Sequence, residues 1–152
     1  MKNKKGYTMM ELLAVIIILG ILMTLAYVGV TKYLKQTKDT IYKDFEKNIT
    51  AGAENYLIEH SSKIPKVGEK LVIDVSKLVC EGYIESLEDP VETNKTCNIE
   101  SYAIITRKDN TEYNMDIEYT ACLKCSNYES PACSNSITGI PRLTKEDSCE
   151  VD

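Results

Sequence analysis

The sequence predicts an α+β fold: one long N-terminal α-helix packed against a small antiparallel β-sheet, with a disulfide-tied, loop-rich C-terminal region. Three observations support this prediction. The first 60 residues contain an apolar run and then a helical pattern. Residues 113–121 alternate between apolar and polar side chains, as a strand with one buried face does. All six cysteines fall in the second half of the chain.

The N-terminal segment is apolar enough to cross a membrane. Residues 12–30 are 19 consecutive residues without a charge, about the length that a helix needs to span the hydrocarbon core. A cleaved signal peptide fits poorly, because its apolar stretch is usually about 7–15 residues and ends at a small-residue site. Lys2, Lys4 and Lys5 precede the run and predict a single-pass segment with its N-terminus in the cytoplasm.

The helical pattern continues beyond the apolar run as an amphipathic half, residues 31–60. Apolar side chains recur there at steps of four or seven residues, which places them on one face: Leu34, Ile41, Phe45, Ile49, Ala53 and Leu57. Pro65 marks the end, because the residue before a proline is pushed out of helical geometry. A helix over 8–60 is about 53 residues, or about 80 Å, long. Such a length is unusual for a globular domain.

The sheet and the tail are predicted in residues 65–152. Leu71–Val75 reads as a short strand, followed by a helical turn that closes at Gly82 in a left-handed conformation. A β-hairpin is predicted over 97–122, with Asp109-Asn110 as its turn. From residue 123 onward the sequence has little periodicity and many turn residues, which indicates a loop-rich tail.

The cysteines are expected to form disulfides, because an even number beyond an export-type segment is typical of an oxidised domain. A hairpin centred on Asp109-Asn110 places Cys97 opposite Cys122 at a non-hydrogen-bonded site, where Cα atoms lie about 4.5 Å apart, within disulfide range. The other pairs expected are Cys133–Cys149 and Cys80–Cys125. A zinc site is the alternative, with four possible ligands: Cys80, Cys97, Cys122 and Cys125.

Charge and composition argue against several functions. Beyond Lys5 the chain carries 15 basic and 23 acidic residues, so we expect no direct nucleic-acid contact. No phosphate-binding loop, nucleophile elbow or paired carboxylates can be placed on rigid elements. We therefore expect neither enzymatic activity nor a cofactor.

Glu11 directly precedes the apolar run, and an ionisable residue in a membrane segment is a functional hypothesis by default. The residues before it are Gly6, Tyr7, Thr8, Met9 and Met10. This run, with its basic start and its apolar continuation, resembles the class III-type leader of the type IV pilin and pseudopilin family. That signature is a basic leader ending in glycine, followed by an aromatic residue, a small polar residue, two apolar residues and glutamate.

The resemblance implies how the chain is processed, where it is located and what it assembles into. A prepilin peptidase would cut between Gly6 and Tyr7 and so remove the leader, residues 1–6; Tyr7 would then be N-methylated. Residues 7–30 would anchor the subunit in the cell membrane and later form the filament core, while 31–152 would form the extracellular head. The implied function is that of a structural subunit of a type IV pilus-like filament on the cell surface. The implied partners are copies of the chain, related pilins, the peptidase and the assembly platform protein.

The resemblance also assigns a role to Glu11, which would meet the N-terminal amine of a neighbouring subunit. Opposite charges removed from water attract strongly, and either one alone is penalised. The pair would therefore set the register of an otherwise apolar contact. One departure is Val28, where many pilins carry proline; here only Gly20 and Gly29 weaken the helix, by about 1 kcal/mol each.

Two other functions remain open. The chain could be a minor pilin or pseudopilin of a DNA-uptake or secretion machine, because such proteins share the same leader. It could also be a membrane-anchored extracellular binding domain that never polymerises. Loss of Glu11 would stop a pilin from assembling, whereas it would leave the folding and export of an anchored domain intact.

Overall fold

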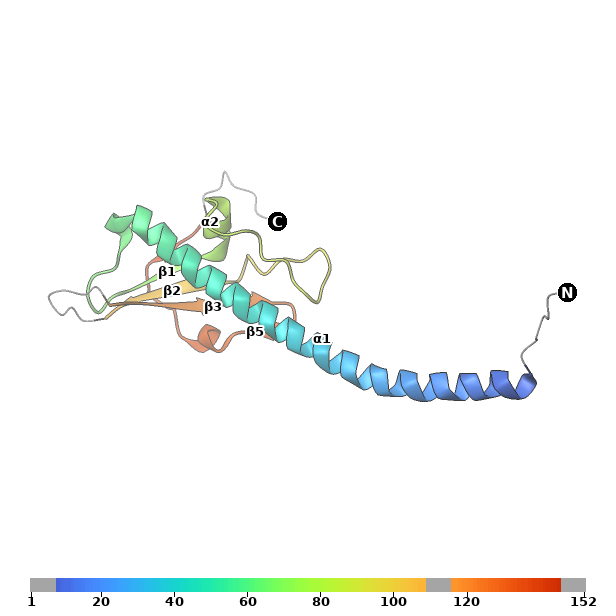
Figure 1. Cartoon of the computed structure of the whole chain (residues 1–152). Helices are drawn as coiled ribbons and strands as arrows, with labels where there is room; N and C mark the ends of the chain where they lie inside the picture. Colours follow the sequence, from blue (N-terminus) through green and yellow to red (C-terminus); the bar gives the residue numbers. More distant parts are fainter. Residues whose placement is uncertain (1–7, 109–115, 146–152) are drawn as a thin grey trace. The chain divides into compact units, whose positions relative to one another are not determined.

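The structure, a computed structural model, describes residues 8–108 and 116–145, except the side chains of Ala26 and Val28. It begins with helix α1 (Met9–Glu59), labelled in Figure 1. The predicted helix, residues 8–60, is thereby confirmed to within one residue at each end. By its contacts the chain divides into two compact units, Met1–Asp39 and Thr40–Asp152.

The first unit consists of the N-terminal part of α1. Its large apolar side chains between Leu12 and Val30 are exposed by 47% or more of their surface, apart from the undescribed Val28. The helix contains a stretch long and apolar enough to cross a membrane, with a mean hydropathy of 2.7, and none of that stretch is buried within the chain. A helix that is apolar all round needs lipid or other protein around it.

The second unit is built around the C-terminal part of α1. One face of this part packs into the main core through Ile49, Ala53 and Leu57, as the apolar stripe predicts. Tyr42 and Tyr56 widen this buried face. The helix ends at Glu59 and is followed by a short 3-10 turn, η1 (Ser61–Lys63).

A four-stranded sheet lies against that face of α1. Its strands are β1 (Lys70–Asp74), β2 (Tyr102–Arg107), β3 (Ile117–Cys122) and β6 (Arg142–Leu143), in the order β3-β2-β1-β6. The first three pair antiparallel, as predicted, and the short β6 adds to β1 in parallel, so that the sheet is mixed. Helix α2 (Val75–Cys80) follows β1 and ends before Gly82, whose φ of 78° confirms the predicted left-handed residue.

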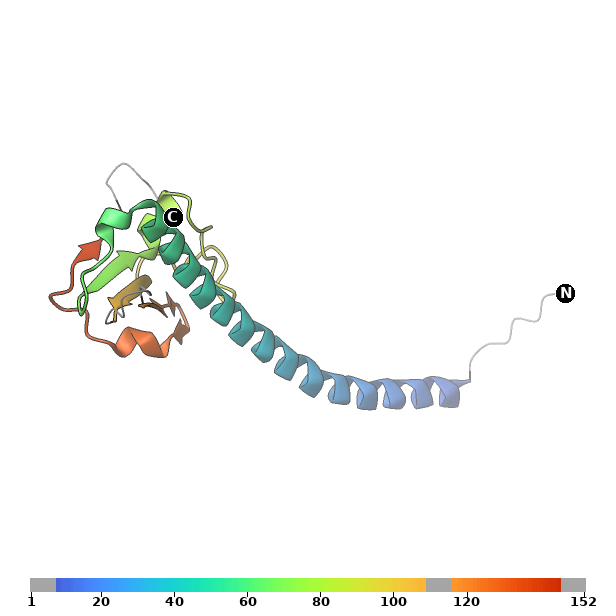
Figure 2. The ribbon, with the colours of Figure 1, turned by 60° about the vertical axis from the view of Figure 1, so that its left-hand side comes forward.

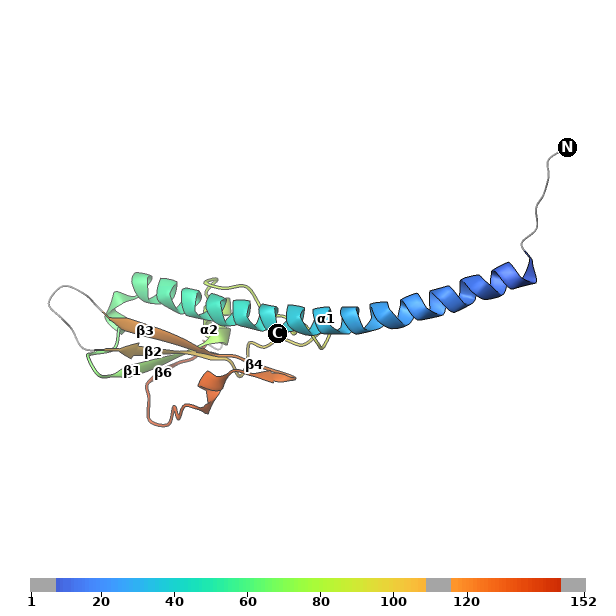
Figure 3. The same cartoon turned by 60° about the horizontal axis from the view of Figure 1, so that its bottom comes forward.

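The sheet is covered on both faces, which gives the second unit three layers (Figures 2 and 3). Ala103 and Ile105 of β2 point into the core beneath α1. Tyr102 and Ile104 point to the opposite side, where Ile137 and Ile140 from the tail pack against them. The short 3-10 helix η2 (Pro131–Ser134) lies on this second side. The tail therefore contributes apolar side chains to a second core on this face of the sheet.

The register of the β2–β3 hairpin differs from the prediction. Tyr102 pairs with Cys122 and Arg107 with Ile117. The sum of the two residue numbers in each pair is therefore five higher than a turn centred on Asp109-Asn110 requires. The reason is that β2 already ends at Arg107 and the backbone N–H of Lys108 donates to the carbonyl oxygen of Asp116. The connection between the two strands is therefore longer than the predicted two-residue turn. Ile117, Tyr119 and Ala121 lie in the main core as predicted, but the opposite face of β3 is not exposed throughout, because Thr120 is half-buried and Cys122 is buried. Asp109-Asn110 and the residues up to Met115 lie outside the described part of the chain.

The register error made the predicted disulfide pairing wrong. The structure pairs Cys97 with Cys125 and Cys122 with Cys133, each with Cα atoms 4.7 Å apart. The expected pairs Cys97–Cys122, Cys80–Cys125 and Cys133–Cys149 are therefore not formed. After β3 the chain makes a second, very small hairpin, β4 (Lys124–Cys125) and β5 (Tyr128–Glu129), which brings Cys125 rather than Cys122 to Cys97. Cys80 is also disulfide-bonded, and Cys149 lies outside the described residues.

Candidate functional site

The N-terminus of α1 is closed by a reciprocal pair of hydrogen bonds between Thr8 and Glu11. The Thr8 backbone N–H donates to Glu11 Oε2 at 2.9 Å, and the Thr8 hydroxyl lies 3.1 Å from the same oxygen. In return, the Glu11 N–H approaches Thr8 Oγ1 at 3.3 Å. The T-x-x-E spacing is that of a capping box, in which the first and fourth residues satisfy each other's backbone groups.

The capping box fixes where the Glu11 carboxylate sits. It lies in the first turn of α1, where the helix dipole favours negative charge. Both described bonds use Oε2, and within the described residues Oε1 accepts none. An ionised carboxylate offers about four acceptor positions. Glu11 can therefore keep its cap and still accept a further, charge-assisted bond from a cation.

Around Glu11 the helix surface is apolar. Met9 and Met10 are 87% and 79% exposed, and Leu12 and Leu13 follow at 59% and 54%. Whatever covers these side chains also takes the carboxylate out of water, because they surround it in the same turns. In such surroundings a cationic partner is strongly favoured and an unpaired carboxylate is costly. Gly6 and Tyr7, the other residues of the expected assembly site, lie outside the described residues, and their roles stay predictions.

The cysteine cluster in the second unit is a structural site. Ligand atoms of Asp89, Cys97 and Cys125 lie within 4.8 Å of one another, a spacing that could hold a metal ion. However, the two sulfurs are bonded to each other, so neither is available as a thiolate ligand. The alternative of a zinc site is therefore overturned: all four of its expected ligands are disulfide-bonded.

Asp89 instead ties two loops together. Its Oδ1 accepts hydrogen bonds from the N–H groups of Val91 at 2.8 Å and Glu92 at 3.3 Å, and its Oδ2 accepts one from Ser126 at 2.9 Å. Burial by itself would raise the pKa of this carboxyl, but the donated hydrogen bonds outweigh it and lower the pKa below 3.8, its ordinary value. The bonds to Val91 and Glu92 are local, whereas Ser126 lies 37 residues away, so no local sequence pattern predicts that Asp89 joins the two loops.

A second cluster that the sequence did not reveal lies where α1 ends. The Tyr83 hydroxyl donates to Glu59 Oε2 at 2.6 Å, and this hydrogen bond is the main reason that the pKa of Tyr83 rises to about 12. His60 stacks on Tyr56 with ring centroids 4.4 Å apart. The ring nitrogen of His60 lies 3.1 Å from the carbonyl oxygen of Tyr56. The Tyr83–Glu59 hydrogen bond and the edge-on contact of Tyr83 with Tyr56 hold the end of α1 against the segment that follows α2.

The comparison with family models concerns the N-terminal segment. Residues 1–27 match the model described as the prokaryotic N-terminal methylation motif. The resemblance to the class III leader of type IV pilins is thereby confirmed over these residues. The motif supports a pilin-like precursor that is processed by prepilin peptidase, and together with the apolar helix it fits a membrane-anchored precursor. No curated protein and no solved structure matches the chain.

Proposed function

Since the chain begins with an N-terminal methylation motif, we propose that it is a structural subunit of a type IV pilus-like filament. Prepilin peptidase removes residues 1–6, Tyr7 becomes N-methylated, and the retained helix polymerises. The observation that carries this proposal is the position of Glu11: a capped carboxylate with spare acceptor capacity at the very start of an exposed, unbroken apolar helix.

The apolar surface supplies a place for the helix but little specificity. In the membrane, lipid chains cover the side chains as well as another helix would, so transfer into a filament core gains little from hydrophobicity itself. Packing of the helices and polar contacts must then decide the arrangement. Glu11 is the only acidic residue before Asp39, and therefore it is the natural determinant of register.

In the filament the amine of Tyr7 from a neighbouring copy pairs with Glu11. The carboxylate keeps its bond to Thr8 through Oε2, while Oε1 receives the amine. Both charges are removed from water together, which is tolerated only when they are paired and hydrogen-bonded. A subunit displaced along the axis would leave both unpaired, and this penalty sets the axial position.

The compartment follows from charge and cysteine chemistry. Lys2, Lys4 and Lys5 precede the apolar segment, and a prepilin peptidase that cuts after Gly6 acts on the cytoplasmic side; both support a cytoplasmic N-terminus. Disulfides form and persist in oxidising environments, which supports a location of residues 31–152 outside the cytoplasmic membrane and, after assembly, on the cell surface. The partners proposed are copies of this chain, related pilins and the assembly platform protein.

Mass spectrometry of the protein recovered from its native host tests the proposal directly. We expect a mature chain that begins at Tyr7 and carries one extra methyl group, in a sheared surface fraction rich in filaments. Exported protein that retains Met1–Gly6 would contradict the proposal and favour a plain membrane anchor.

Substitution of Glu11 gives an independent test. Glu11→Ala removes the charge and the cap, whereas Glu11→Gln keeps an acceptor for Thr8 and removes only the charge. We expect both variants to be cleaved and to reach the membrane, and neither to appear in sheared filaments. If Glu11→Gln assembles like the wild type, the charge pair does not set the register.

A further inference from the structure

A basic segment follows the apolar part of α1. We call residues 30–38 the basic stem; they contain Lys32, Lys35 and Lys38, and no acidic residue occurs between Leu12 and Lys38. Residues three positions apart are neighbours on a helix surface. Tyr33 and Leu34 lie among the lysines and are 70% and 52% exposed. None of the three lysines takes part in an ion pair within the described residues.

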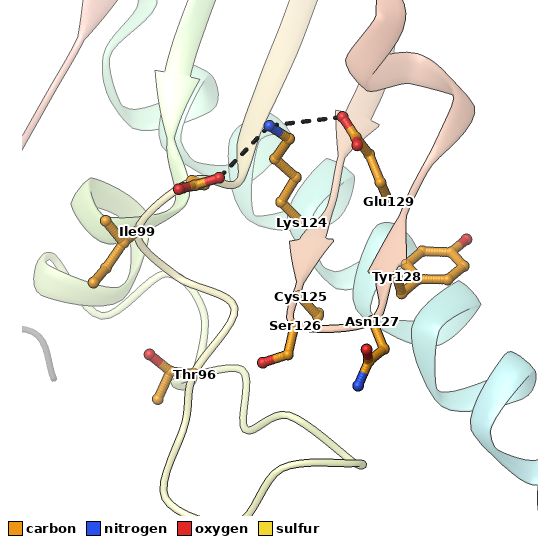
Figure 4. A pocket seen from close by; sticks show the side chains of 9 residues that line it. Thr96, Ile99, Lys124, Cys125, Ser126, Asn127, Tyr128 and Glu129 are labelled. Carbon is orange, nitrogen blue, oxygen red and sulfur yellow. Dashed lines mark ion pairs between the residues drawn. The ribbon is translucent and has the colours of Figure 1, made fainter.

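The second unit carries a surface on which acidic residues surround an exposed apolar side chain, as the lysines of the basic stem surround Tyr33 and Leu34. Two adjoining depressions share Thr96 and Ile99 as lining residues, and Ile99 is 70% exposed. Figure 4 shows one depression, with Ile99 and Thr96 on one side and the β4–β5 hairpin on the other. We call the charged residues that line either depression, together with Ile99, the head patch. The charged residues are Glu88, Asp89, Glu92, Lys95, Glu100, Lys124 and Glu129.

The two surfaces carry opposite charge. The head patch has five acidic and two basic residues, a net charge of −3, of which the buried Asp89 supplies one; the basic stem has three lysines, a net charge of +3. Within the patch Lys124 is shared by Glu100 at 3.5 Å and Glu129 at 3.7 Å, so one carboxylate is in excess there (Figure 4). Glu88 is exposed and makes no ion pair in the described part of the chain.

We propose that the head patch of one copy docks on the basic stem of a neighbouring copy. This inference rests on the proposed function and names the contact that joins the outer layer of the filament. Ile99 would pack against Tyr33 and Leu34, while the excess carboxylates of the patch meet the three lysines. The stem begins where the apolar segment ends, so packing of apolar segments in a filament core places each stem beside neighbouring copies. Residues 40–152, with 12 basic and 21 acidic residues, supply the opposite charge.

Zero-length cross-linking of wild-type filaments tests the contact without any substitution. A carbodiimide joins a lysine to a carboxylate only when the two are in direct contact. Filaments grown from a mixture of isotopically light and heavy subunits identify which links join different copies. We expect mixed-isotope links between peptides that contain Lys32, Lys35 or Lys38 and peptides that contain Glu88, Glu92, Glu100 or Glu129. Intermolecular links confined to other residues would overturn the inference.

A charge exchange provides the second test. The stem variant carries Lys32→Glu, Lys35→Glu and Lys38→Glu, and the patch variant carries Glu88→Lys, Glu92→Lys and Glu100→Lys. We expect each to lower the yield of sheared filaments by about tenfold or more, because like charges then face each other. The combined variant should recover most of the yield. Lys63→Glu, Lys66→Glu and Lys70→Glu make the same change at exposed positions outside both surfaces and should assemble like the wild type.

Processing and disulfide mapping of each variant separate the inference from the proposed function. Glutamates on the outer side do not reverse the orientation of a membrane segment, so cleavage at Gly6 and the Cys97–Cys125 and Cys122–Cys133 bonds should be unchanged. If wild-type filaments form but the combined variant gains nothing, the docking contact is wrong and the proposed function stands. If the stem variant instead dissociates from anionic vesicles while its filament yield stays normal, the lysines bind lipid headgroups and the inference is overturned. If no wild-type filaments form at all, both fail.

Discussion

Asp89 offers the sharpest test of how the head is held together. In Asp89→Ala, the N–H groups of Val91, Glu92 and Ser126 lose the acceptor that now binds them at 2.8, 3.3 and 2.9 Å. A hydrogen bond to a charged group contributes about 1.5–3 kcal/mol, and two of these three are short. Because water can reach the vacated site, we take the lower end for two bonds and expect a loss of about 3 kcal/mol in the free energy of unfolding.

The effect of pH follows from the lowered pKa of Asp89. A carboxyl whose pKa is lower in the folded than in the unfolded state contributes stability above its unfolded pKa, and this contribution disappears as the pH falls through the folded value. The ordinary value is 3.8. The stability difference between the wild type and Asp89→Asn should therefore be full at neutral pH and shrink as the solution is acidified below this value.

Urea unfolding of the full chain in detergent micelles, with disulfides intact and followed by near-ultraviolet circular dichroism, measures both effects. Glu88→Ala serves as the matched control, because this neighbouring carboxylate is exposed and should change stability by no more than about 0.5 kcal/mol. A loss for Asp89→Ala that is as small as the control's, or a difference for Asp89→Asn that persists unchanged in acid, would refute the account of this carboxylate.

Three further predictions concern other parts of the second unit. A Cβ added at Gly52 would lie 2.3 Å from Cγ2 of Ile84, so Gly52→Ala should lower the free energy of unfolding by about 1–3 kcal/mol through overpacking. A Cβ added at Gly29 would meet no atom within 4 Å, so Gly29→Ala should cause no such loss. Urea unfolding compares the two variants. Spectrophotometric titration should find a tyrosine with a pKa of about 12 that is lost in Tyr83→Phe, and its persistence in that variant would contradict the assignment. Non-reducing peptide mapping should recover Cys97–Cys125 and Cys122–Cys133. Replacing both cysteines of a pair by serine should cost about 3.6 kcal/mol for the first and about 2.8 kcal/mol for the second, from their loop lengths; the reverse order would contradict the entropic argument.

The features predicted correctly from the sequence are those that depend on local pattern. The bounds of α1 follow from an apolar run, a helical stripe and Pro65, all of which act over a few residues. Gly82 in a left-handed conformation is likewise a local matter. The capping box of Thr8 and Glu11 also has a recognisable local spacing. It was not predicted, because a charge beside a membrane segment was attributed only to a partner in a neighbouring subunit.

The features predicted wrongly depend on pairing between distant residues. One misplaced turn shifted the β2–β3 register, and because disulfides join atoms only a few ångströms apart, that single shift sent Cys97 and Cys122 to different partners. Strand β6 was not predicted, because two residues carry no period. The apolar character of β2 on both faces indicates that something covers each side, yet only the structure identifies the tail around Ile137 and Ile140 as the second cover.

The distribution of lysines along the N-terminal helix has a consequence for movement. In the precursor, lysines stand on both sides of the apolar segment, at Lys2, Lys4 and Lys5 and again at Lys32, Lys35 and Lys38. Carrying a lysine side chain through the bilayer centre costs about 2.5–3.5 kcal/mol in either direction, so the precursor resists sliding both inward and outward. Cleavage after Gly6 would remove the inner lysines and keep the outer ones. The barrier from lysine side chains would then oppose only inward movement of the segment. Single-molecule pulling on the head should therefore extract the mature chain from vesicles at a lower force than the precursor.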